Sequence, residues 1–108
     1  MSAEELLQHL PARAVFRRDK MAKVDCFRST RLLVGLNCFD AGQSQPVHAH
    51  AGADKFYLVV SGKARFVIGE QRLDAGPGDL LLAPAGVPHG VETAQERTVL
   101  LVGMAPAP

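Results

Sequence analysis

Two histidines stand two residues apart in the stretch PVHAHAGADKFYLVVSG, residues 46–62. Because side chains alternate along a strand, His48 and His50 are expected to face the same side, with Cα atoms roughly 6–7 Å apart. Both imidazoles can then bind one metal ion, which needs a further ligand from elsewhere in the chain. His89, in the loop PAGVPHG, is the candidate. The spacing therefore makes His48, His50 and His89 candidates for one metal site, while a histidine in a sheet is also commonly a hydrogen-bonded surface or core residue.

The segments that must position these histidines are short strands separated by glycine and proline. Many short strands favour an antiparallel sandwich or barrel, because such sheets bury an apolar face by stacking or closing. One short helix is predicted before them, because Ser2 and Glu5 form a capping box and Pro11 blocks continuation. Ten candidate strands cover residues 13–17, 23–28, 30–39, 46–50, 55–61, 63–69, 71–74, 79–83, 89–93 and 97–104.

Length and charge limit the classes of function. A chain of 108 residues fits one domain, and 12 basic against 11 acidic residues create no field that attracts nucleic acid or an anionic membrane. The basic segment 16–23 is interrupted by Asp19 and is interpreted as a solvated face. No apolar run approaches the about 20 residues of a membrane helix, and the N-terminus is acidic, unlike a signal peptide. We expect a cytoplasmic protein in which Cys26 and Cys38 are free thiols.

The histidines also belong to a longer pattern. One run reads G-x5-H-x-H-x4-K-x6-G and a second reads G-x5-P-x-G-x2-H-x3-T. These runs resemble the two signature motifs of the cupin family, except that Lys55 stands in place of a glutamate and Thr93 in place of an asparagine. The positions in register are Gly42, His48, His50, Gly62, Gly78, Pro84, Gly86 and His89.

The resemblance implies an all-β fold, an antiparallel jelly-roll or double-stranded β-helix barrel, over residues 21–104. A helix and arm at 1–20 would precede it, and a frayed tail at 105–108 would follow. Small cupins commonly dimerise, and the arm is available to pair with a neighbour, so we expect a homodimer.

The resemblance also implies a metal in the mouth of the barrel, bound by His48, His50 and His89. The cofactor would be a divalent transition metal: iron, manganese, nickel, copper, cobalt or zinc. Cupins include oxygenases, isomerases, decarboxylases and sugar-binding sensor domains, so the fold alone does not fix the reaction.

Lys55 is the departure with chemical consequences. An ammonium has no electron pair to donate, and at about 4 Å from a divalent cation its charge costs roughly 8 kcal/mol at an effective dielectric constant of 20. The amine could turn to solvent or to Asp54 or Asp79, it could lose its proton and act as a base or ligand, or it could face an anionic substrate. A barrel without metal is a further alternative. Asp54 could supply the missing carboxylate only through a bulge.

Two functions fit these residues. One is a metal-dependent oxygenase or isomerase acting on a small, oxygen-rich molecule, with Lys55 steering an anionic group. Tyr57 shares the face of Lys55 and could hydrogen-bond a ligand, although an aromatic residue on a barrel strand is also ordinary core. The alternative is a non-catalytic module that binds or senses a small molecule.

Overall fold

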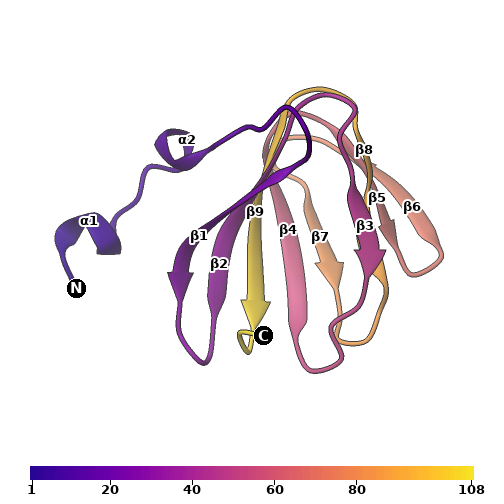
Figure 1. Ribbon diagram of the computed structural model, residues 1–108. Coiled ribbons are helices and arrows are strands. Elements are labelled where there is room, and N and C mark those ends of the chain that lie inside the picture. The colour runs from indigo at the N-terminus through magenta and orange to yellow at the C-terminus, as the bar shows by residue number, and fades with distance from the viewer.

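A computed structural model describes residues 1–108 as nine strands in two antiparallel sheets that face each other (Figure 1). The five-stranded sheet has the order β1 (Ala22–Arg28), β2 (Leu33–Phe39), β9 (Thr98–Ala105), β4 (Asp54–Ser61), β7 (Leu80–Ala83). The four-stranded sheet has the order β3 (Gln45–His48), β8 (His89–Ala94), β5 (Ala64–Ile68), β6 (Gln71–Ala75). The expected all-β jelly roll is confirmed.

Nine of the ten expected strands are present, and the segment 13–17 is the exception. Two of its apolar residues pack against a sheet face, and the segment pairs with no strand edge. Ala14 and Phe16 contact a small apolar cluster on the outer side of the five-stranded sheet. The carbonyl of Arg17 accepts a hydrogen bond from the Gln43 side chain at 2.7 Å, which fixes the end of this arm.

The single expected helix is instead two helices of one turn each, α1 (Ala3–Leu6) and α2 (Leu10–Arg13). The capping box is confirmed, since Glu5 N donates to Ser2 Oγ at 3.3 Å and Ser2 N donates to Glu5 Oε1 at 3.4 Å. Pro11 lies in the first turn of α2, where a missing N–H leaves no hydrogen bond unmade, so the proline begins a helix and does not end one. Neither helix is long enough to cross a membrane.

Strand β2 is buried on both faces and forms part of the barrel wall. Leu36 and Cys38 face outward and are covered by the N-terminal arm. Phe39 faces inward, into the core between the two sheets. Because side chains alternate, Asn37 also faces inward. Polar side chains on this inner face, such as that of Asn37, therefore point into the barrel interior.

Strand β4 alternates in the same way, with Lys55, Tyr57 and Val59 on the buried side. The turn after β4 needs glycine at position 62, because φ is +87° and a Cβ there would lie 2.3 Å from the Arg97 carbonyl oxygen. Beyond the expected boundary, β9 runs to Ala105, and the Pro108 carbonyl accepts a hydrogen bond from Arg28 at 3.1 Å.

Candidate metal centre

The three predicted histidines meet at one end of the barrel. His48 ends β3, His50 follows two residues later, and His89 begins β8 directly opposite His48 in the strand pairing. The ring centroid of His48 lies 4.5 Å from that of His89 and 4.9 Å from that of His50. The candidate ligand atoms all lie within 4.8 Å of one another. Three imidazoles bound to one ion at about 2.0–2.1 Å would have their nitrogens within roughly 4 Å of one another, which is near the separations found here.

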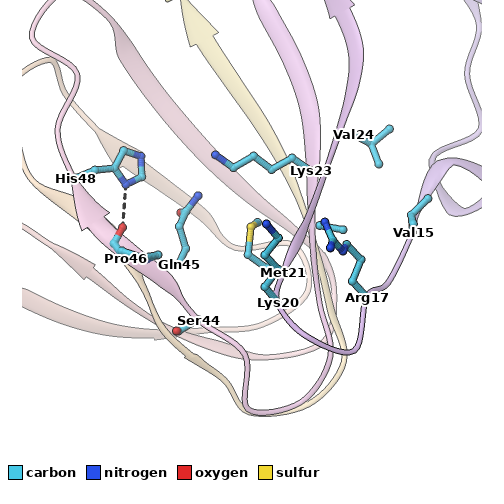
Figure 2. Close-up of a pocket in the computed structure, with 11 residues that line it drawn as sticks. Val15, Arg17, Lys20, Met21, Lys23, Val24, Ser44, Gln45, Pro46 and His48 are labelled. Carbon is cyan, nitrogen blue, oxygen red and sulfur yellow. Dashed lines mark hydrogen bonds between the residues drawn. The ribbon is translucent and has the colours of Figure 1, made fainter.

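Backbone hydrogen bonds orient two of these rings. His48 Nδ1 lies 2.9 Å from the Pro46 carbonyl oxygen (Figure 2), and His89 Nδ1 lies 3.0 Å from that of Val87. A carbonyl only accepts, so Nδ1 carries the hydrogen and Nε2 keeps a free electron pair. His89 Nε2 is buried and has no hydrogen-bond partner. A buried polar atom without a partner is destabilising, and a metal ion would satisfy it. The donor set therefore fits a metal.

The surroundings of His50 and His89 favour the neutral form of these two imidazoles. Burial, and after it the positive charge of neighbouring groups, lowers the pKa of His50. Burial likewise lowers the pKa of His89, with Lys55 contributing in the same direction. Neutral imidazole is the form that binds metal, so near neutral pH these two rings are in the protonation state that coordination requires.

The loop that carries His89 is tied to the loop that carries His50. Gly86 N donates to the His50 carbonyl at 2.9 Å, with Gly86 at φ +79°. Ala85 N donates to the Asp54 carboxylate at 2.9 Å. Asp54 therefore fixes the loop and does not join the histidines, so the sequence-based alternative in which it replaces the family glutamate is not supported.

Lys55 lies inside the barrel and not at its surface. The residue is 6% exposed, and its Nζ lies 4.6 Å above the centroid of the Tyr57 ring. It lines a cavity of about 250 Å³ together with His48 and His50. It forms no salt bridge, and Asp79 instead accepts from Gly76 N. The amine therefore pairs with neither Asp54 nor Asp79, and the burial of the residue does not support the interpretation in which the side chain turns to solvent. Burial, and after it the charge of Lys23, lowers the pKa of Lys55 to about 8.

Tyr57 is fully buried beside the site and packs against Phe66, with 5.2 Å between the ring centroids. Its hydroxyl donates to Gln45 Oε1 at 2.7 Å. Burial raises the pKa of Tyr57, so the hydroxyl stays protonated. Tyr57 thus positions Gln45, in addition to serving as core.

Sequence reasoning missed three residues that line the cavity: Gln45, Lys23 and Asn37. Strict alternation places residue 45 opposite to His48, but β3 has a register shift between them that brings both to the inner side. Lys23 pairs with Asn37, whose strand position faces inward. The sequence predicts that segment 16–23 forms a solvated face. Lys23 is exposed, as that predicts, but it also borders the cavity. Only the pairing of β1 with β2 reveals this.

Comparison with known proteins identifies the family. Residues 35–103 match the Cupin domain family, and the chain belongs to it. An uncharacterized protein of Streptomyces coelicolor is 33% identical over 85 residues, which cover 79% of this chain and 80% of that protein. The dimethylsulfoniopropionate lyase DddQ of Ruegeria pomeroyi is 32% identical over 77 residues, or 70% of this chain. The matched chain spans 38% of the length of that lyase.

Solved structures agree with this assignment. The TT1209 protein of Thermus thermophilus has a TM-score of 0.90 and 39% identity, covering 94% of this chain and 98% of that chain. An RmlC-like cupin from Desulfovibrio desulfuricans has a TM-score of 0.82 and 31% identity, covering 93% and 96%. KdgF from Halomonas sp., at 22% identity and a TM-score of 0.77, covers 82% and 80% and shares the fold.

Removal of single histidines tests the metal centre. We expect His48→Ala and His89→Ala each to abolish stoichiometric metal binding while the barrel stays folded, because two imidazoles chelate too weakly. His9→Ala is the control, since His9 lies at the start of α2 and outside the cluster. Metal content per chain and circular dichroism measure the outcome. Equal metal content in the wild type and His48→Ala would refute the assignment.

Substitution of Lys55 tests whether its charge acts on the centre. Lys55→Glu exchanges repulsion for a carboxylate ligand and should tighten binding of one divalent ion at least about tenfold, or ~1.4 kcal/mol. Lys55→Met removes only the charge and should tighten it less. Lys63→Glu, just beyond the far end of β4, controls for net charge. Calorimetric titration compares the four proteins, and indistinguishable affinities would show that Lys55 does not influence the ion.

Proposed function

We propose that this cupin is a metal-dependent oxygenase or isomerase that acts on a small, oxygen-rich molecule. His48, His50 and His89 would hold a divalent transition metal: iron, manganese, nickel, copper, cobalt or zinc. The observation that carries the proposal is the buried, unpartnered Nε2 of His89 within a cluster of three histidines. Such a metal supplies Lewis acidity and, where it is redox-active, electron transfer.

The chain's own residues would bind and orient the substrate. Lys55 offers a buried positive charge beside the histidines, which would draw an anionic oxygen toward the centre. Val102 and Met104 provide an apolar wall of the same cavity, which limits access of water. Tyr57 holds Gln45 through its hydroxyl and so keeps the amide aimed at the cavity.

A non-catalytic binding or sensing module is the second candidate. The observation that favours it is the absence of a carboxylate from the histidine cluster, which leaves no acidic residue among them to move a proton. The Tyr57 hydroxyl is already engaged by Gln45. A lyase activity like that of the relative from Ruegeria pomeroyi is a further outcome to test, although its substrate carries a cationic sulfonium group.

Metal loading followed by turnover assays separates these functions. Protein purified without a histidine tag would be analysed for metal, then loaded with each of the six metals in turn. Flavonols, diketones and thiols would be screened for oxygen uptake, and dimethylsulfoniopropionate for cleavage. We expect turnover with at least one metal and none in His48→Ala. Stoichiometric binding of metal and ligand without turnover would favour the binding module. Absence of metal binding would refute both the metal-dependent oxygenase and the metal-dependent isomerase.

We propose that the protein forms a homodimer and resides in the cytoplasm. The helix α1 extends away from the barrel (Figure 1), and its end exposes Leu6 at 70% and Leu7 at 83%. A second chain would cover these leucines and gain apolar burial.

Light scattering at micromolar concentration should therefore give the mass of two chains. The double variant Leu6→Ser with Leu7→Ser should shift the protein toward the monomer, because the contact loses its apolar groups. Leu73→Ser, on β6 of the other sheet, is a matched control and should leave the mass unchanged. A monomeric wild type would contradict the proposal.

A further inference from the structure

The cavity beside the three histidines presents positive charge and hydrogen-bond donors that the protein leaves unpaired. Three side chains from different strands contribute: Lys23 from β1, Lys55 from β4 and Gln45 from β3. These side chains belong to the centre already described. That their ligand is the substrate rests on the proposed function.

Gln45 supplies a directed donor. The residue is 5% exposed, and its Oε1 already accepts the hydrogen bond from the Tyr57 hydroxyl. Its Nε2 is buried without a partner. An unsatisfied buried donor costs about 1–3 kcal/mol, which an acceptor oxygen of a ligand would recover. The amide therefore selects a ligand that carries acceptors.

The two lysines supply unbalanced charge. The acidic side chain that lines the cavity is Asp25, and its carboxylate already lies 3.8 Å from Arg28 in an ion pair; Arg28 also donates a hydrogen bond to Pro108 at the cavity. Neither Lys23 nor Lys55 has a salt-bridge partner. Two ammonium groups facing one small cavity repel each other, and a bound anion would remove this repulsion.

A wider pocket between the arm, β1 and β3 adjoins this cavity. It has a volume of about 890 Å³ and shares Lys23, Gln45 and His48 with the inner cavity. In Figure 2, Lys23 extends from β1 toward the side of the pocket where His48 and Gln45 lie. Lys20 also lines the opening, so an approaching anion meets positive charge before it reaches the histidines.

We propose that the ligand of this centre is a small carboxylate that passes between β1 and β3 and is held by Lys23, Lys55 and the Gln45 amide. The apolar wall of Val102 and Met104 favours an organic anion with a carbon skeleton over inorganic phosphate, which has the charge alone. The carboxylate would then lie beside the three histidines.

Titration of chelator-treated, metal-free protein tests this ligand class without the metal. Succinate is the probe, succinamide its uncharged counterpart and inorganic phosphate the competing anion, all at one ionic strength and pH 7. We expect succinate to bind at least tenfold more tightly than succinamide or phosphate. Calorimetry or chemical-shift changes report binding.

Four variants assign the contacts. Lys55→Met should weaken succinate binding at least tenfold and Lys23→Met at least threefold, whereas Lys63→Met, beyond the far end of β4, should change it less than twofold. Gln45→Glu keeps an acceptor for Tyr57 but replaces the donor with negative charge, so binding should be lost. Thermal unfolding checks that each variant folds, and Lys55→Met, which removes a buried charge, should unfold at a higher temperature than the wild type.

Equal binding of succinate and succinamide, or no binding of succinate, would overturn the proposal. Retention of wild-type affinity in both Lys55→Met and Lys23→Met would do the same. Phosphate binding that exceeds succinate binding and depends on the same lysines would replace the carboxylate with a phosphate. Metal content measured without succinate tests the proposed function separately, so the failure of one proposal can be told from the failure of the other.

Discussion

The pairing of β3 with β8 is the constraint on which the centre depends. It sets His48 opposite His89, and the register shift in β3 sets Gln45 opposite Val91 on the same inner side. The two strands approach so closely that a Cβ at Gly90 would lie 2.7 Å from the Gln45 carbonyl oxygen. Glycine directly after His89 is thus a condition for this contact. A slip of one residue would turn His48 away from its partner.

The buried lysine gives the centre a character unlike that of a glutamate-containing cupin. A carboxylate would complete the ligand set and reduce the charge of an ion, whereas Lys55 adds positive charge and would leave coordination to the imidazoles. Burying an unpaired amine opposes folding, and only the Tyr57 ring beneath it offers partial compensation. Residues that break a general rule of stability in this way are expected at functional sites.

The sequence predicts the strands and the histidines well because both follow simple periods. The alternation around His48 and His50 and the turn residues between strands are local features, and the structure places them as expected. The period fails at Gln45, because a bulge adds one residue to β3. Segment 13–17 has a short apolar run that is also typical of a strand, but packing of Phe16 on a sheet face prevails over strand pairing. Lys23 was missed because its direction depends on which strand lies beside it.

Strand β3 has only four residues and forms the edge of its sheet, with β8 as its one neighbour. Short edge strands open more easily than central ones. His48 on β3 and His89 on β8 would share an ion, so the ion would act as a cross-link between the edge and the interior of the sheet. The free energy of metal binding would then add to the free energy needed to unfold this edge locally. Occupancy by a metal ion and rigidity of the opening beside β3 would in this way be thermodynamically coupled.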